Sequence, residues 1–218
     1  VYADNNIELI LGAVATKIDA STRTLELGCG RTLFYNKLAL CTGARVREFP
    51  GAPQSDRILY LRNAEDALRL QRFATAGRRA VIIGGGYIGL EAAAVLQKLG
   101  LETTVLEMAD RVLERVTSET LSSYLTTLHA MHGVSVKTGC SVTCITGGED
   151  ETQALSVECG DGEHYTADLI LVGIGVLPET SLAESAGLET DDGILVSETG
   201  KTSDSDIFAA GDCTRHPN

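Results

Sequence analysis

Residues 80–107 constrain the fold more than any other stretch, because they read AVIIGGGYIGLEAAAVLQKLGLETTVLE. Residues 80–83 are an apolar, β-branched run of strand length, and a glycine-rich turn at 84–89 follows at once. Residues 90–99 are strong helix formers, and residues 103–106 are a second β-branched run. The order of strand, glycine turn, helix and strand predicts a parallel βαβ unit of a Rossmann-like α/β fold.

The glycines of this turn fit the pattern G-x-G-x-x-G on Gly84, Gly86 and Gly89. The first glycine allows the tight turn, the second lets the backbone approach a pyrophosphate, and the third lets the helix pack on the strand. The start of the helix supplies free N–H groups and a positive dipole end for phosphates. We therefore expect a dinucleotide site that uses the whole turn: Gly84, Gly85, Gly86, Tyr87, Ile88 and Gly89.

Glu107 ends the second strand about 20 residues past the glycines, where an acid accepts hydrogen bonds from a ribose 2′-hydroxyl. A carboxylate there would repel a 2′-phosphate, so the sequence favours NADH over NADPH. Arg111 lies close behind and is a cation that could weaken this preference. The alternative is a glycine-rich turn of another doubly wound sheet that binds no dinucleotide.

The composition indicates a folded and strongly anionic protein. The 218 residues are 44% hydrophobic, enough for one large domain or two small ones. The net charge of −12 argues against partners such as nucleic acid or an anionic membrane surface. No apolar run reaches the length of about 18 residues that a membrane helix needs, and we find no signal peptide. We expect a cytoplasmic protein.

The cysteines are scattered along the chain, at positions 29, 41, 140, 144, 159 and 213. No C-x-x-C pair occurs, and no Cys/His cluster has the spacing of a zinc site, so we expect no metal. Separate, buried or half-buried thiols in a reducing compartment are the favoured interpretation. A redox-active disulfide is the alternative, and no local pattern supports it.

The first part of the chain differs in pattern from the βαβ unit. Residues 16–19 and 24–27 alternate in polarity around a turn and predict a β-hairpin, and residues 31–35 predict a third strand. Residues 37–44 predict a strand that runs into a small-residue turn, so the segment to about residue 44 reads as mostly antiparallel β. Residues 45–57, with two prolines and a glycine, read as a connector.

Two further helices are predicted from their caps. Asn63 can cap a helix that reaches about Phe73, and Ser118 can cap one that reaches His132. The second helix has an apolar face that we expect to be core, formed by Leu121, Leu125, Leu128 and Met131. Its histidines, His129 and His132, read as a solvated helix end.

The later strands complete the predicted sheets. Residues 134–137 read as the next parallel strand, and residues 168–173 as a buried one. Between them, residues 142–145, 154–159 and 164–165 predict a short antiparallel meander. A short helix at 182–188 and a strand at 193–196 are expected near the end of the chain.

Residues 202–212, TSDSDIFAAGD, resemble the second flavin motif of the FAD-dependent pyridine nucleotide-disulfide oxidoreductase superfamily. Residues 40–44, LCTGA, resemble the turn by which that family crosses from its FAD domain to its NAD domain. Residues 171–178, LVGIGVLP, resemble the segment that crosses back. With the glycine fingerprint, these motifs span the chain in the family's order.

Within the superfamily, residues 84–91, 106–113 and 171–175 are most similar to the NADH-dependent ferredoxin reductases of bacterial oxygenase systems. These are the reductases of the putidaredoxin, rubredoxin and biphenyl dioxygenase kinds. The resemblance implies that Asp212 hydrogen-bonds the ribityl chain of FAD and that Glu91 lies near the nicotinamide. It also places the crossing residues at the cofactors: Thr42, Gly43, Arg47, Gly173, Ile174 and Gly175. Val46 stands where many members have proline.

The resemblance also implies a division into domains. Residues 1–46 and 177–218 are expected to be parts of an FAD-binding domain, and residues 47–176 an NAD-binding Rossmann-like domain. The family's first FAD fingerprint and its C-terminal domain have no counterpart in this sequence. We therefore expect a fragment of a longer protein, whose intact form holds FAD and which by itself retains FAD weakly or not at all.

The function that this likeness implies is transfer of a hydride from NADH to FAD, and then of single electrons to a small iron–sulfur protein, a ferredoxin or rubredoxin. The alternatives are an NAD-binding redox sensor resembling apoptosis-inducing-factor-type proteins, and a disulfide reductase of the same superfamily. A single-domain dehydrogenase is disfavoured, since no Tyr-x-x-x-Lys or His–Asp pair stands out.

Overall fold

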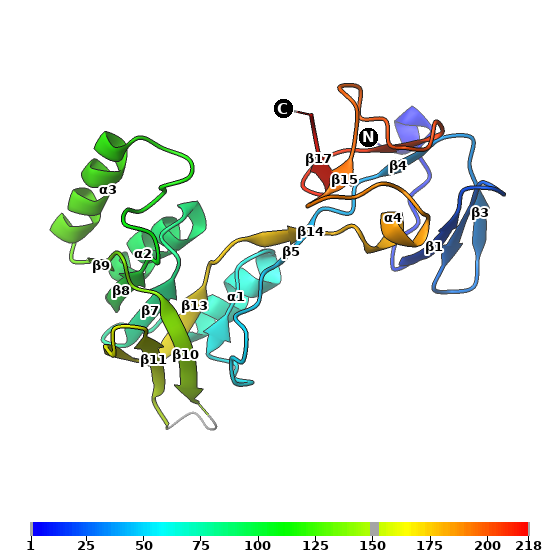
Figure 1. Cartoon of the computed structure of the whole chain (residues 1–218). Coiled ribbons are helices and arrows are strands. Elements are labelled where there is room, and N and C mark those ends of the chain that lie inside the picture. Colours follow the sequence, from blue (N-terminus) through cyan, green and yellow to red (C-terminus); the bar gives the residue numbers. More distant parts are fainter. Residues whose placement is uncertain (1, 149–152, 218) are drawn as a thin grey trace. The chain divides into compact units, whose positions relative to one another are not determined.

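The computed structural model describes residues 2–148 and 153–217, and the chain divides into two compact units. Residues 46–176 form one unit, and residues 1–45 and 177–218 together form the other (Figure 1). Both units combine strands with helices, and the α/β class predicted from the sequence is confirmed. None of the helices in the described residues is both long enough and apolar enough to cross a membrane.

The unit of residues 46–176 is built on a five-stranded parallel sheet with the order β6-β13-β7-β8-β9. Its strands are β6 (Ile58–Leu59), β7 (Arg79–Ile83), β8 (Glu102–Leu106), β9 (Ser135–Lys137) and β13 (Leu169–Val172). The crossover helices are α1 (Ala64–Phe73), α2 (Tyr87–Lys98) and α3 (Glu119–Met131). The βαβ unit predicted for residues 80–107 is β7, α2 and β8.

Both faces of this sheet are covered, which explains why β7 and β13 are apolar without alternation. Ala80 and Ile82 of β7 pack toward α1 and α2, in a cluster with Ala93 and Leu96. Their neighbours on β7, among them Val81, pack on the opposite face, because successive side chains of a strand point to opposite sides.

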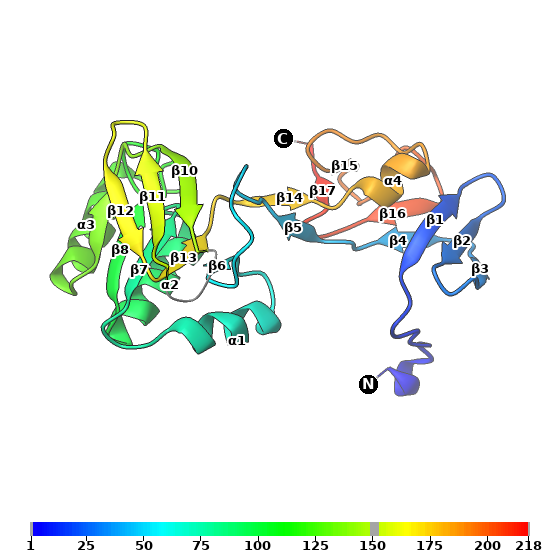
Figure 2. The same ribbon diagram turned by 90° about the horizontal axis from the view of Figure 1, so that it is seen from below.

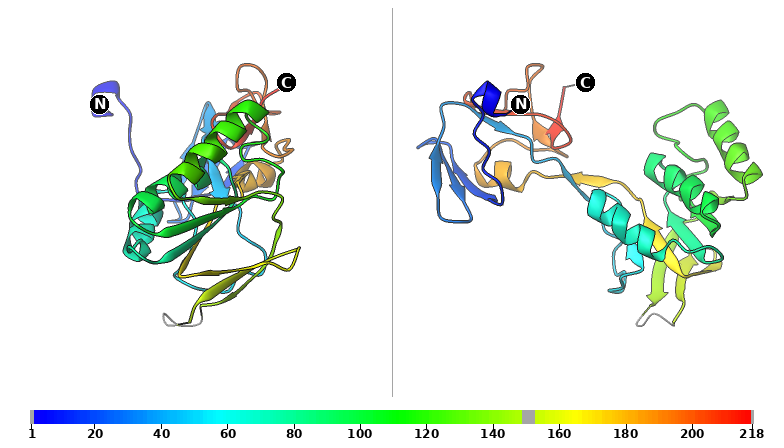
Figure 3. Two further views of the ribbon diagram at one scale, coloured as in Figure 1. Left: turned by 90° about the vertical axis from the view of Figure 1, so that its left-hand side faces the viewer. Right: turned by 180° about the vertical axis from the view of Figure 1, so that it is seen from behind.

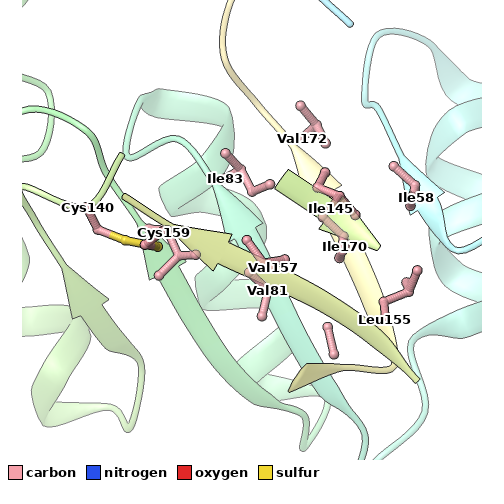
Figure 4. Packing of buried hydrophobic residues seen from close by; sticks show 12 residues of the cluster. Ile58, Val81, Ile83, Cys140, Ile145, Leu155, Val157, Cys159, Ile170 and Val172 are labelled. Carbon is pink, nitrogen blue, oxygen red and sulfur yellow. A yellow bond between two sulfur atoms is a disulfide. The ribbon is translucent and has the colours of Figure 1, made fainter. Parts of the chain in front are cut away.

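The opposite face is covered by an antiparallel meander of three strands, as predicted (Figures 2 and 3). They are β10 (Val142–Gly147), β11 (Leu155–Cys159) and β12 (His164–Ala167). Their inward residues meet the sheet in a continuous apolar layer (Figure 4), made by Ile58, Val81, Ile83, Ile145, Leu155, Val157, Ile170 and Val172.

The same layer contains a disulfide, between Cys140 and Cys159, so the prediction of separate thiols is wrong for this pair. The two residues are 19 apart in sequence, which hid the pairing, but β10 and β11 place Val142 opposite Cys159. Closing a loop of this length stabilises a fold by about 3 kcal/mol in the chain-entropy account. The four other cysteines, Cys29, Cys41, Cys144 and Cys213, are free.

The predicted helix caps are confirmed. Asn63 forms a capping box with Asp66 at the start of α1, and the Ser118 hydroxyl accepts the Leu121 N–H at the start of α3. The predicted core face of α3 is confirmed at Leu125, which packs on a buried cluster, but is wrong at Leu121 and Met131, which are 45% and 77% exposed. The inward face is turned by about one residue and carries the buried, hydrogen-bonded Ser122.

The unit of residues 1–45 and 177–218 contains three small sheets. β1 (Ala15–Asp19), β2 (Thr24–Leu27) and β3 (Thr32–Phe34) form the predicted antiparallel sheet. The other pairs are parallel: β4 (Leu38–Leu40) with β16 (Ile207–Ala209), and β15 (Ile194–Leu195) with β17 (Thr214–Arg215). The expectation of mainly antiparallel β before residue 44 therefore fails at β4, whose partner is 169 residues away in the register Leu38↔Ile207.

The remaining elements of the chain are short. The 3-10 helix η1 (Ala3–Asn5) precedes β1, and α4 (Ser181–Ser185) packs its Ala183 into a core with Ile18 and Ile207. The two crossings between the units, β5 (Ala44–Val46) and β14 (Val176–Pro178), pair as a two-stranded sheet.

One ion pair ties the beginnings of β7 and β13 together. The Asp168 carboxylate accepts the Arg79 backbone N–H at 2.8 Å and is paired with the Arg79 guanidinium, whose Nη2 is 2.8 Å from Oδ1. The hydrogen bond from the Arg79 side chain, assisted by its backbone N–H and against partial burial, lowers the pKa of Asp168 below its usual 3.8.

Asp168→Asn is expected to lower the free energy of unfolding by about 1 kcal/mol at pH 7, the value of a partly exposed pair. A lowered folded-state pKa means that this contribution is present above the unfolded-state value and is lost as the pH falls through the folded one. Urea unfolding of both proteins at pH 7 and near pH 3 measures the difference. A difference that grows on acidification would contradict the assignment.

Candidate functional site

The glycine turn after β7 requires its glycines because backbone segments approach closely there. A Cβ on Gly89 would lie 2.0 Å from the Gly84 carbonyl oxygen, and one on Gly84 would lie 2.4 Å from the Gly173 carbonyl oxygen. Gly84 also has a φ of +109°, which favours glycine. The turn therefore brings three of the predicted site residues together at the carboxyl ends of β7 and β13.

The second glycine of the motif has a different environment. Gly86 is the N-cap of α2, no side chain caps this helix end within the described residues, and a Cβ on Gly86 would meet nothing within 4 Å. Tyr87 and Ile88 form the exposed first turn, whose N–H groups have no carbonyl partner inside the helix. An open helix start with the cap position bare of a side chain suits an anionic phosphate.

Glu107 is held directly beside this turn. Its Oε2 accepts the Gly85 N–H at 2.6 Å, and its Oε1 accepts the Ala109 N–H at 2.8 Å. An ionised carboxylate has about four lone-pair sites, so acceptor positions remain for ribose hydroxyls. The structure thus places an oriented acceptor beside the uncapped start of α2.

Arg111 does not act as the free cation expected beside Glu107. Its Nη1 donates to the Thr117 carbonyl at 2.9 Å and to the Ser122 hydroxyl at 2.8 Å. Its Nη2 donates to the Glu114 carbonyl at 2.8 Å. The guanidinium therefore hydrogen-bonds to the loop between β8 and α3 and to the first turn of α3.

The carboxyl end of β13 lies beside the glycine turn. The Gly173 N–H donates to the Ile83 carbonyl at 2.8 Å, and Gly175, with a φ of +104°, accepts the Arg47 N–H at 3.0 Å. Because β7 is flanked by β8 and β13, the crossover connections leave in opposite directions at this point. Such a switch point is where open α/β sheets bind ligands.

Glu91 lies within α2, one turn after Tyr87, and its side chain is exposed. The Arg47 side chain is also exposed. The structure therefore leaves both side chains accessible to a ligand.

The predicted flavin residues of the other unit follow two adjacent parallel strands. Thr42 and Gly43 come after β4, and Asp212 comes after β16, with the Ala210 N–H donating to the Leu40 carbonyl at 3.0 Å. The Thr42 hydroxyl donates to the Glu179 carbonyl at 2.6 Å. Asp212 is exposed and is followed by β17. These residues therefore follow the carboxyl ends of two paired strands.

Several residues that surround Glu107 or support the loop after it were not predicted as site residues. Ala109 donates to Glu107, the Cys140 N–H donates to the Glu107 carbonyl at 2.9 Å, and Ser122 supports the loop from α3. A serine amid the apolar positions of α3 was the available signal. Among the described residues, no group of metal-ligating side chains is found.

His129 is a further correction, because it is half-buried rather than a solvated helix end. Its Nδ1 lies 2.8 Å from the Leu125 carbonyl oxygen and its Nε2 lies 3.1 Å from the Leu90 carbonyl oxygen. The ring therefore lies between α3 and α2, at the residue that directly follows the glycine motif.

Comparison with known proteins identifies a protein family that this chain matches. A family model described as "Pyridine nucleotide-disulphide oxidoreductase" matches residues 2–218. Putidaredoxin reductase CamA of Pseudomonas putida is 42% identical over 98% of this chain and 52% of its own length. Rubredoxin-NAD(+) reductase of Pseudomonas putida is 36% identical over 97% of this chain and 55% of its own length.

Solved structures agree with these relatives. A crystal structure of a covalent putidaredoxin reductase–putidaredoxin complex matches with a TM-score of 0.93 and 41% identity, over 100% of this chain and 53% of that one. A NAD-dependent persulfide reductase from A. fulgidus matches with a TM-score of 0.89 and 34% identity, over 96% of this chain and 39% of that one. The chain spans about half the length of the curated relatives it matches.

Gly89→Ala is expected to lower the free energy of unfolding by about 3 kcal/mol, since its Cβ would overlap the Gly84 carbonyl oxygen at 2.0 Å. Gly86→Ala is the matched control. Its Cβ enters open space, so its cost should stay within about 1 kcal/mol, as for other N-cap changes. Urea unfolding of the two variants measures the contrast, and equal costs would refute the close packing.

Proposed function

Because the chain belongs to the pyridine nucleotide-disulphide oxidoreductase family, we propose that it is part of an NADH-dependent flavoprotein reductase that passes electrons to a small iron–sulfur protein. The names of its relatives, which include reductases of putidaredoxin and rubredoxin, support this choice of acceptor. The observation that carries the proposal is the open helix start at Gly86 beside the oriented Glu107 carboxylate.

The nucleotide site has three parts in this proposal. The first turn of α2, from Gly86 to Ile88, binds the pyrophosphate through N–H groups and the helix dipole. Glu107 accepts the hydroxyls of the adenosine ribose and repels a 2′-phosphate, which gives a preference for NADH. The glycine run 173–175 forms the floor of the crevice beside β7, and Ile174 lies between its two glycines.

The flavin site is formed by residues that are far apart in the sequence. Thr42, Gly43 and Asp212 would bind FAD at the carboxyl ends of β4 and β16, with Asp212 accepting a hydrogen bond from a hydroxyl of the ribityl chain. Arg47 would contact the flavin, and Glu91 would position the nicotinamide. When both are bound, FAD accepts a hydride from NADH and releases the electrons one at a time. The protein's own residues bind and orient, and none is needed as a nucleophile.

The units correspond in this proposal to the family's two domains. Residues 47–176 would be the NAD-binding domain, and residues 1–46 and 177–218 would be parts of the FAD-binding domain of a cytoplasmic protein. A redox sensor and a disulfide reductase remain the alternatives, because both would use the same nucleotide site.

The proposal is tested by an electron-transfer assay with the intact protein, FAD, NADH and either a ferredoxin or a rubredoxin. We expect NADH-dependent reduction of the acceptor, with NADPH a poor donor. Gly86→Ala should raise the KM for NADH about tenfold or more, because its methyl group fills the approach to the pyrophosphate.

Three outcomes separate the alternatives. Oxidation of NADH without transfer to either acceptor would favour the sensor. A small disulfide is added as a third acceptor, and electron transfer to it alone would favour the disulfide reductase. Equal KM values for the wild type and Gly86→Ala would reject this nucleotide site, provided that the variant unfolds at the same urea concentration as the wild type.

A further inference from the structure

Arg111 lies four residues after Glu107, and its guanidinium donates its hydrogen bonds to acceptors of the protein itself. Its guanidinium joins two carbonyls of one loop, those of Glu114 and Thr117, to the Ser122 hydroxyl on α3. The loop runs from the end of β8 to the start of α3. We infer that Arg111 is a positioning residue, which folds this loop against Gly85 and so keeps Glu107 in place for the ribose.

The first step of the argument leads from Arg111 to Val112. The Ser122 hydroxyl has one proton, which it donates to the Val112 carbonyl at 2.6 Å, so it accepts from Arg111. Ser122 is buried, 1% exposed, and would be left with an unpaired lone pair if the guanidinium were removed. Arg111 and Ser122 therefore fix the carbonyl of a residue that is itself fully buried.

The second step leads from Val112 to the glycine turn. The Val112 Cγ1 lies 3.0 Å from where a Cβ of Gly85 would stand, and the Leu113 N–H donates to the Gly85 carbonyl at 3.0 Å. Leu113 has a φ of +53°, a costly conformation for a residue with a side chain, which persists only where its surroundings impose it. Arg111 contributes to that constraint on both sides of Leu113, because it donates to the Glu114 carbonyl directly and holds the Val112 carbonyl through Ser122.

The third step leads from Gly85 to Glu107. Gly85 lies between Val112 and the Glu107 side chain, and its N–H donates to Oε2 of Glu107. If the loop moves away, the Gly85 carbonyl loses the Leu113 N–H, and Gly85 loses its contact with the Val112 side chain. The carboxylate would then lose its orientation toward the ribose. The inference rests on the proposed NADH site, and it excludes Arg111 as a ligand of a 2′-phosphate, because its donors are directed into the loop.

The test is a double-mutant cycle on NADH binding, measured by isothermal titration calorimetry with the whole chain. We expect Glu107→Gln and Arg111→Met each to weaken NADH binding about tenfold, the value of one or two hydrogen bonds to a charged group. The double variant should be weakened only about tenfold to twentyfold, because Arg111 acts through Glu107. Arg111→Met should also reduce the preference for NADH over NADPH.

Three further variants separate a positioning role from a general loss of folding. Ser122→Ala removes only the hydroxyl between Arg111 and Val112, and it should weaken NADH binding about threefold with the same dependence on Glu107. Arg72→Met, an exposed arginine in the last turn of α1, is the matched control and should bind NADH as the wild type does. Arg111→Lys should restore part of the affinity, because one ammonium cannot reach all three acceptors.

Contrary results have distinct meanings. A weakening of about a hundredfold in the double variant, or unchanged NADH binding by Arg111→Met, would overturn the inference about Arg111. Either result would leave the proposed nucleotide site standing. A selective loss of NADPH binding in Arg111→Met would make Arg111 a phosphate ligand instead. A wild-type chain that binds no NADH would overturn the proposed nucleotide site and this inference together.

Discussion

The close approach of Gly84, Gly89 and Gly173 is the constraint on which the proposed nucleotide site depends. A Cβ on Gly84 or Gly89 would come within 2.4 Å of a carbonyl oxygen. Without these contacts α2 could not begin directly at the end of β7, and β13 could not lie beside the turn. The site is therefore set by backbone packing, and side chains then refine its chemistry.

Glu107 and the loop behind it supply that refinement. The carboxylate is fixed by two N–H groups, and the loop from residue 108 to 118 is held by the Arg111 guanidinium. On the far side, the segment at Cys140 donates to the Glu107 carbonyl and is joined by a disulfide to β11. Glu107 therefore accepts hydrogen bonds from three different segments, through the N–H groups of Gly85, Ala109 and Cys140. These bonds hold its carboxylate in one orientation, unlike a flexible carboxylate on the surface.

Local patterns predicted most of this fold, and long-range contacts explain what they missed. The βαβ unit, the meander and the caps at Asn63 and Ser118 follow from strand runs, turn residues and capping residues close in sequence. The Cys140–Cys159 disulfide and the parallel pairing of β4 with β16 depend on partners brought together by the sheets, for which the sequence has no short-range signal. A long-range contact also explains the exposure of Leu121. The hydrogen bond from the Ser122 hydroxyl to the Val112 carbonyl directs Ser122 to the interior, so that the neighbouring Leu121 faces solvent.

The most direct test of the nucleotide site is a two-dimensional ¹H–¹⁵N spectrum of the labelled chain during titration with NAD⁺. The account predicts saturable shifts in the amide signals of residues 84–89, of Gly85 and Ala109 around Glu107, and of residues 173–175. Signals of the meander's outer strand β12 should not move. Shifts that are absent from the glycine turn, or that gather elsewhere on the chain, would contradict the account.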